Sequence, residues 1–334
     1  MGEKTSYFQG KSIIIFVPSD FGLPVVFRKN LEFLGFTVFL LPAPEKNRLA
    51  LPSKIIHLLK KTFLGNKTHK SAKLAEQISK MHIDFLENIS HKIDYALVIR
   101  PDYLCENVLK ILANKVNLSV AYQWDGMQRF PRTKNLIKYF DRFFVFDEDD
   151  EKLYPKTIHI SNFYFDYLSH ASENSEDVFF VGTFMKDRID QIVSLSEKFS
   201  KLNLKTNINV IYKKRRQIRR YEKHNINFRT SGMNFEEAIK NIHSSKIVLD
   251  FQNSIHNGLS LRTFEAMGYQ KKLITNNPLV KKYNFFHPNN IFIVNNNDLS
   301  GIEDFIHSDF FPTPRNIIEQ YSFTDWINKV LKND

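Results

Sequence analysis

The feature that most constrains the fold is a run of β-branched and apolar residues at Ser12–Val17, followed by a helical pattern and a second apolar run. The helical pattern extends over 24–34 and stops at Gly35, and the second run covers Phe36–Leu41. Runs that are apolar on both faces are typical of strands in a parallel sheet covered by helices. A strand, a helix and a strand within about thirty residues form a βαβ unit. The sequence therefore predicts an α/β protein.

The composition fits a globular protein that meets an anionic partner. The 334 residues suffice for two domains of ordinary size, and 43% of them are hydrophobic. A net charge of +11 favours a nucleotide, a nucleic acid, a phospholipid headgroup or an acidic glycan as partner. The single cysteine, Cys105, excludes a disulfide framework and a multi-cysteine zinc site, and favours a reducing compartment. Residues 1–10 carry no secretion signal and no apolar run reaches the ~18 residues of a transmembrane helix, so we expect a cytoplasmic protein.

The alternation of strands and helices occurs twice, with a polar interruption at Ser169–Glu176. We predict further strands at 95–99, 118–122, 143–146, 178–181, 208–211, 247–250, 272–275 and 291–294, and further helices at 53–92, 188–202, 235–244, 259–268 and 324–331. This pattern predicts a Rossmann-like domain over 11–168, a second one over 177–315, and a C-terminal segment over 316–334 whose helix packs back on the first domain.

The most informative segment follows the predicted strand that ends at Asp250. A loop with Gly258 leads into a helix that Ser260 can cap, and such a helix N-terminus at the carboxyl end of a strand suits a diphosphate. Arg262 and Glu265 are three residues apart, so they are neighbours on one side of the helix. The arginine can bind phosphate and the carboxylate can accept two ribose hydroxyls. An ordinary surface ion pair is the alternative.

Two aspartates follow predicted strands of the first half. Asp125, directly after Trp124, is either a general base or nucleophile on the acceptor side, or a turn residue. Trp124 either stacks on a sugar or packs in the core. Asp20, in the loop after the first strand, has the same two interpretations, and the structural turn is favoured for it.

Several basic residues and segments have two interpretations each. His256 either donates to a diphosphate or is an exposed loop residue, and the window Lys213–Arg220 either is a solvated surface or binds donor, anionic acceptor, membrane or nucleic acid. Nucleic acid is the minor interpretation, because no RNP, KH or zinc-finger pattern accompanies the window. The lysine-rich stretch 53–73 either rests on anionic lipid or packs on the core. The sequence has no clean His/Asp cluster of metal-ligand type.

The segment Asp177–Phe184, with Arg188 after it, resembles the strand–turn–helix that opens the second domain of CgeB-like glycosyltransferases. Gly258–Gly268, followed by Lys271–Asn277, resembles their donor-site helix and next strand. The stretches 122–126 and 146–150 are similar to the same group, whose members occur in bacterial lipopolysaccharide and capsule gene sets. The likeness covers roughly residues 118–294.

The resemblance implies a GT-B fold, in which two Rossmann-like domains face each other across a cleft and the C-terminal one holds a nucleotide-sugar. Glu265 would bind the ribose, Gly182 and Thr183 would line the phosphate side, and Arg262 or Arg188 would neutralise the diphosphate without a metal. Many retaining enzymes of this fold carry a second glutamate eight positions before the one at Glu265. This chain has Asn257 there, so retention and inversion both stay open.

We therefore expect a nucleotide-sugar-dependent glycosyltransferase without a cofactor that extends a bacterial surface glycan, lipopolysaccharide or capsule. Its partners would be a nucleotide-sugar donor, a glycan or lipid-linked glycan acceptor and an anionic membrane surface. It would be cytoplasmic, or peripheral at the inner face of the plasma membrane. Two alternatives remain: a nucleotide-sugar 2-epimerase of the same fold, and a non-catalytic protein that binds polyanions or glycans.

Overall fold

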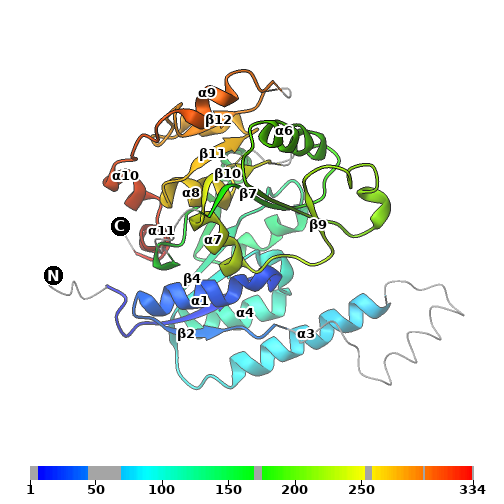
Figure 1. The fold of residues 1–334 in the computed structure, drawn as a ribbon. Coiled ribbons are helices and arrows are strands. Elements are labelled where there is room, and N and C mark those ends of the chain that lie inside the picture. The colour runs from blue at the N-terminus through cyan, green and yellow to red at the C-terminus, as the bar shows by residue number, and fades with distance from the viewer. Residues whose placement is uncertain (1–6, 44–68, 169–174, 253–257, 296–297, 333–334) are drawn as a thin grey trace, which may run out of the picture.

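The protein folds into two α/β halves, each built on a parallel six-stranded sheet (Figure 1). The computed structural model describes residues 7–43, 69–168, 175–252, 258–295 and 298–332. Every strand predicted from an apolar run is present, with ends that move by at most a few residues. The predicted helix 53–92 is present as His69–Glu87, and its residues 53–68 lie outside the described part of the chain.

The first sheet has the strand order β2-β1-β3-β4-β5-β6, and all of its pairs are parallel. The order reverses between β1 and β3, and at such a point the loops leave the carboxyl ends of neighbouring strands in opposite directions and open a crevice. The strands are β1 (Ser12–Phe16), β2 (Thr37–Leu40), β3 (Ile93–Ile99), β4 (Val116–Gln123), β5 (Arg142–Val145) and β6 (Ile158–His159).

The second sheet has the order β9-β8-β7-β10-β11-β12, which is the 3-2-1-4-5-6 order of a dinucleotide-binding domain. Its reversal point lies between β7 and β10, so these two strand ends are where a nucleotide is expected. The strands are β7 (Glu176–Thr183), β8 (Thr206–Ile211), β9 (Asn227–Arg229), β10 (Ser245–Asp250), β11 (Lys272–Thr275) and β12 (Ile291–Ile293).

Helices cover both faces of each sheet, because each sheet is apolar on both faces. In the first half, α1 (Leu23–Phe33) packs on one face, and α3 (His69–Glu87) and α4 (Glu106–Lys115) pack on the other, while the short α5 (Glu148–Leu153) follows β5. In the second half, α7 (Phe235–His243) and α8 (Leu261–Gly268) cover one face, and α6 (Ile189–Lys201) and α9 (Ile302–His307) cover the other.

The chain passes between the halves twice, and the two crossings run side by side. The Tyr164 N–H donates to the Tyr321 carbonyl at 3.0 Å, and the Phe323 N–H donates to the Tyr164 carbonyl at 2.8 Å. The second crossing connects α10 (Arg315–Gln320) to α11 (Phe323–Leu331), which packs with α1 on the first sheet. The polypeptide therefore ends on the half in which it began (Figure 1).

Glycines of the second half lie against aromatic rings of the first half and of the crossing segment, which lets the two halves approach closely. A Cβ atom added at any of three glycines would come within 2.2 or 2.3 Å of a ring atom. At such distances a side chain would force the halves apart. The pairs are Gly232 with Phe21, Gly258 with Phe146, and Gly268 with Tyr164.

A buried carboxylate fixes the loop that follows β4. Asp150, on α5, is only 1% exposed and accepts a hydrogen bond from the Met127 N–H at 2.8 Å. Burial raises the pKa of Asp150 to about 6, the Met127 N–H opposes the rise, and the charges of Asp147 and Asp149 add to it. The loop between β4 and the Met127 anchor carries Asp125, so the ionisation of Asp150 bears on how firmly that loop is held.

We expect Asp150→Asn to stabilise the protein above neutral pH. Between about pH 4 and 6 the folded protein binds more protons at this site than the unfolded chain does, so the unfolding free energy falls as the pH rises through that window. The total loss is at most about 3 kcal/mol, and asparagine avoids it because its amide oxygen still accepts from Met127. Urea unfolding at about pH 5 and pH 8 measures the difference. The exposed Asp84→Asn is the control, and equal pH slopes for Asp150→Asn and wild type would contradict the expectation.

Candidate functional site

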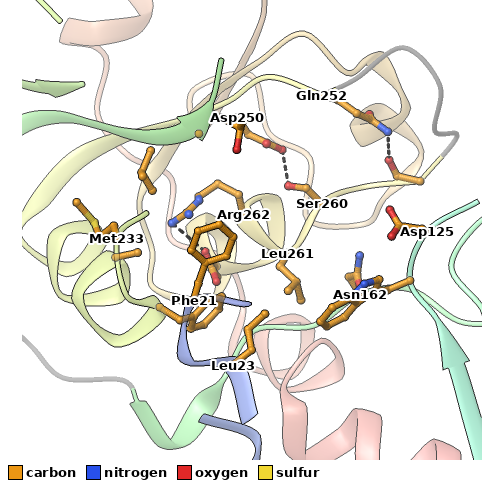
Figure 2. A pocket seen from close by; sticks show the side chains of 18 of the residues that line it. Phe21, Leu23, Asp125, Asn162, Met233, Asp250, Gln252, Ser260, Leu261 and Arg262 are labelled. Carbon is orange, nitrogen blue, oxygen red and sulfur yellow. Dashed lines mark hydrogen bonds and ion pairs between the residues drawn. The ribbon is translucent and has the colours of Figure 1, made fainter. Parts of the chain in front are cut away.

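A pocket of about 440 Å³ lies between the two halves, where the carboxyl ends of the strands of both sheets meet (Figure 2). It lies at the reversal points of both sheets, since the end of β7 and the chain after β1 and β10 contribute to its lining. Asp20 and Arg188 do not line it, and His256 lies outside the described residues. The predicted site residues that line the pocket are Trp124, Asp125, Gly182, Thr183, Gly258, Ser260, Arg262 and Glu265.

The N-terminus of α8 is tied to the end of β10. The Asp250 carboxylate accepts from the Ser260 hydroxyl at 2.7 Å (Figure 2) and from the Thr263 hydroxyl at 2.9 Å. Ser260 is also the N-cap of α8, since its hydroxyl accepts from the Thr263 N–H. The start of α8, with its unpaired N–H groups and its positive dipole end, is therefore fixed beside the pocket.

Arg262 and Glu265 form an ion pair on the pocket side of α8. Their Nη1 and Oε2 atoms are 3.1 Å apart, and the Glu265 side chain is only 2% exposed. Both atoms are buried, and neither makes a hydrogen bond within the described residues. Burial raises the pKa of Glu265, the Arg262 guanidinium opposes the rise, and the Asp250 charge adds to it. The pair is thus a buried acceptor and a buried donor with unused hydrogen-bonding capacity.

The end of β7 forms another wall, with Arg188 directly behind it. The Arg188 Nη1 donates to the Phe251 carbonyl at 2.8 Å, and its Nη2 donates to the Thr183 carbonyl. A Cβ at Gly182 would lie 3.1 Å from that Nη2 atom and 2.8 Å from the Phe180 ring. Arg188 therefore joins the ends of β7 and β10 through their main chain, and Arg262 is the cationic side chain among the described residues that line the pocket.

On the opposite wall, Asp125 is held by an arginine that the sequence did not single out. The Arg100 Nη1 donates to the Asp125 carboxylate, and its Nε and Nη2 donate to Asp102 at 2.7 Å each. Arg100 has a left-handed backbone (φ 61°) at the end of β3, and its guanidinium lies 3.9 Å from the centre of the Phe130 ring. This buried guanidinium fixes the orientation of Asp125 at the pocket wall.

The remaining predicted residues of the first half have separate surroundings. Trp124 lies between the pocket and the core, with its ring 6.5 Å from that of Phe27. Asp20 is exposed, and the neighbouring Phe21 contributes to the lining in its place.

Several lining residues carry no signal in the sequence. Asn162 accepts from the Tyr122 hydroxyl at 2.6 Å and donates to the Leu259 carbonyl at 2.8 Å, so it connects the two halves. Gln252 donates to the Gly258 carbonyl at 2.7 Å and thereby fixes Gly258. The role of Asn162 depends on contacts between distant segments, and that of Gln252 on the course of one loop. The only hint in the sequence was their position in a loop or after a strand.

The basic window 213–220 folds into a compact turn after β8, whose last residue, Ile211, lines the pocket. Two buried side chains, Ile218 and Tyr221, anchor the turn, and the Gln217 side chain accepts from the Lys213 and Lys214 N–H groups. Its outer face carries the exposed cations Lys213, Lys214, Arg216 and Arg219.

Within the described ranges, no group of three His, Cys, Asp or Glu side chains is arranged to hold a metal ion. The helices of those same ranges include none that is both long and apolar enough to span a bilayer.

No family model matches the sequence, and no curated protein matches it. Solved structures match over nearly the whole chain. An α-glucosyltransferase in complex with UDP and a 13-mer DNA containing an HMU base has a TM-score of 0.53 and 14% identity, covering 96% of this chain and 98% of its own. A UDP-forming α,α-trehalose-phosphate synthase from Burkholderia xenovorans has a TM-score of 0.56 and 10% identity, with 97% and 98% covered.

A sucrose-phosphate synthase from Thermosynechococcus elongatus has a TM-score of 0.55 and 11% identity, with 97% of this chain and 95% of its own covered. At such low identity the likeness concerns the fold, and it agrees with the two sheets and the pocket between their strand ends. The chain therefore has the GT-B fold, in which two Rossmann-like domains face each other across a cleft.

Proposed function

We propose that this chain is a glycosyltransferase that moves a sugar from a nucleotide-sugar donor to an acceptor hydroxyl. The observation that carries the proposal is the buried carboxylate of Glu265, a residue of the pocket lining. Its Oε2 atom makes no hydrogen bond within the described residues, and its partner there is the Arg262 guanidinium, 3.1 Å away in the ion pair. An ionised carboxylate only accepts hydrogen bonds, so a ligand at this place should bring hydroxyl donors. The two hydroxyls of a ribose meet that need.

The same helix supports a site for the diphosphate of the donor. Its N-terminus offers unpaired N–H groups, and Arg262 adds a guanidinium two residues after Ser260. Gly182 and Thr183 bring the end of β7 to the same pocket without a bulky side chain at Gly182. Negative charge grows on the diphosphate as the bond to the sugar breaks, so these fixed donors would lower the barrier without a metal.

Asp125 is the proposed catalytic carboxylate on the acceptor side. It enters the pocket from the first half, opposite α8, and Arg100 fixes its orientation. A carboxylate so placed can accept the proton of the attacking hydroxyl. Trp124 lines the pocket next to it, and its ring offers an apolar face to a sugar.

For the acceptor we propose a bacterial surface glycan, lipopolysaccharide or capsule, extended at the cytoplasmic face of the membrane. The resemblance to CgeB-like proteins supports this choice, and the exposed cations of the 213–220 turn favour an acceptor or a lipid surface with negative charge. A nucleotide-sugar 2-epimerase would use the donor site without an acceptor. A non-catalytic binding protein would hold polyanions without a nucleotide preference.

Thermal unfolding with UDP, GDP, CMP, CDP and dTDP tests the donor site. We expect one nucleotide to raise the Tm of the wild type, because a ligand at about 100 times its Kd stabilises the fold by about 2.7 kcal/mol. Glu265→Ala should abolish the shift, and Glu265→Gln should retain part of it, since the amide keeps one acceptor oxygen.

The control is Glu303→Ala, which removes an exposed carboxylate from α9 and should leave the nucleotide shift unchanged. Addition of EDTA should also leave it unchanged if transfer needs no metal. A wild type whose Tm responds to none of the nucleotides would contradict the proposed function and favour the binding protein.

Charge reversal tests the basic turn. The triple variant Lys214→Glu, Arg216→Glu, Arg219→Glu should lose binding to vesicles of anionic lipid or to an acidic glycan, and should keep its nucleotide-induced Tm shift. Vesicle sedimentation tests the lipid, and a separate binding assay tests the glycan, so the two partners are distinguished. Each assay is run at two salt concentrations, because an electrostatic contact weakens with salt. The matched control reverses three exposed lysines elsewhere: Lys80, Lys110 and Lys138. Equal binding by both triple variants would contradict a role for the turn.

A further inference from the structure

We propose that Phe21 closes the mouth of the pocket against water, and that its ring holds this position by packing on Gly232 of the opposite domain. The expected consequence for sugar transfer rests on the proposed function, whereas the closure itself is testable without any substrate. Phe21 lies in the short turn Asp20–Gly22 between β1 and α1, at the reversal point of the first sheet. Figure 2 shows its ring at the pocket, above Leu23 and near Arg262 in that view.

The backbone of Phe21 is held in an unfavourable conformation. Its φ of 55° and ψ of 21° lie in the left-handed region, which bulky side chains rarely adopt. Gly22 follows with φ 77°, so this turn contains two successive residues in the left-handed region. Such strain persists only where surrounding contacts impose it, and it is concentrated at ligand clamps and active sites.

The contact that imposes it comes from the second domain. A Cβ at Gly232 would lie 2.2 Å from Cε1 and 2.6 Å from Cδ1 of Phe21, so the ring occupies the space that any side chain at 232 would need. Next to it, Asn234 lies against Gly22, and Lys29 on α1 forms a 2.6 Å ion pair with Glu236 on α7. The turn, the glycine and the two helices thus make one junction across the cleft, where α1 and α7 are neighbours (Figure 1).

The exposure of Phe21 points to closure and not to core packing. The residue is 50% exposed, yet it also lines the pocket. Its ring therefore lies at the rim of the pocket that Trp124, Arg262 and Glu265 line, with one side in solvent. A half-exposed phenylalanine contributes little to the core, so burial of its ring does not offset the strain in its backbone.

Closure matters for a glycosyl donor because water competes with the acceptor. If a water oxygen bonds to the anomeric carbon while the bond from that carbon to the diphosphate oxygen breaks, the products are free sugar and nucleoside diphosphate, and a proton passes to solvent. Exclusion of water from the pocket suppresses this side reaction. The ratio of donor hydrolysis to transfer therefore reports on the closure.

Three variants test the proposal: Phe21→Ala, Gly232→Ala and their combination. Phe21→Ala removes the ring, and Gly232→Ala displaces it, so each should raise the ratio of hydrolysis to transfer several-fold. The double variant should match Phe21→Ala, because without the ring the new methyl group meets nothing there. Such non-additivity is the mark of a direct contact.

Acrylamide quenching of tryptophan fluorescence gives a readout without substrate. The chain has two tryptophans, and Trp326 is only 2% exposed, so the quencher reports chiefly on Trp124 in the pocket. Phe21→Ala and Gly232→Ala should increase the quenching constant. The control Phe311→Ala removes a phenylalanine of similar exposure, 52%, that packs on His287 outside the pocket, and it should change neither readout.

The outcomes separate this inference from the proposed function. Unchanged quenching in Phe21→Ala, or additive effects in the double variant, would overturn the closure. Increased quenching with an unchanged ratio of hydrolysis to transfer would overturn its role in excluding water. Increased quenching in a protein that neither binds nucleotides nor consumes any donor would uphold the closure and refute the proposed glycosyl transfer.

Discussion

The site depends on how closely the carboxyl ends of the two sheets approach each other. A pocket shared by two domains exists only if side chains from both reach the same space, and here the approach is set by aromatic rings that pack on glycines. The ring of Phe146 lies where a Cβ of Gly258 would be, and the ring of Tyr164 does the same at Gly268. Because Gly258 precedes α8 and Gly268 is its last residue, these contacts locate the helix that carries Arg262 and Glu265.

The strands were predictable because each is a short apolar run between turn residues, and burial on both faces leaves no other explanation for such runs. Helix α8 was predictable because a cap, Ser260, precedes an apolar side with Phe264 and Gly268 on it. The acidic α5 has no apolar periodicity, and β9 (Asn-Phe-Arg) has no apolar run, so neither could be predicted. Contacts with other elements stabilise both: β9 pairs with β8, and Asp150 of α5 is buried.

Candidate side chains at strand ends were predictable, and their partners were not. The rule that ligands bind at carboxyl ends led to Asp125 and to Glu265, and both line the pocket. Arg100 comes from the end of a different strand, and its link to Asp125 exists only once β3 and β4 are paired. Phe21 has no motif at all, since its position depends on a glycine more than two hundred residues away in the sequence.

In the proposed function, the charges at the pocket would couple the diphosphate and the ribose of the donor. Three carboxylates and one guanidinium occur among its described lining residues. Arg100 compensates Asp125, and two hydroxyl groups donate to Asp250. Among the described lining residues, Arg262 is the cation that faces Glu265. Arg188 donates to main-chain carbonyls instead. In the proposed function, a diphosphate beside α8 draws on Arg262 while ribose hydroxyls satisfy Glu265. A diphosphate alone would leave Glu265 without its cation, and a ribose alone would leave Arg262 without its anion. Binding of both groups compensates both side chains, which favours an intact nucleoside diphosphate over nucleoside or phosphate alone.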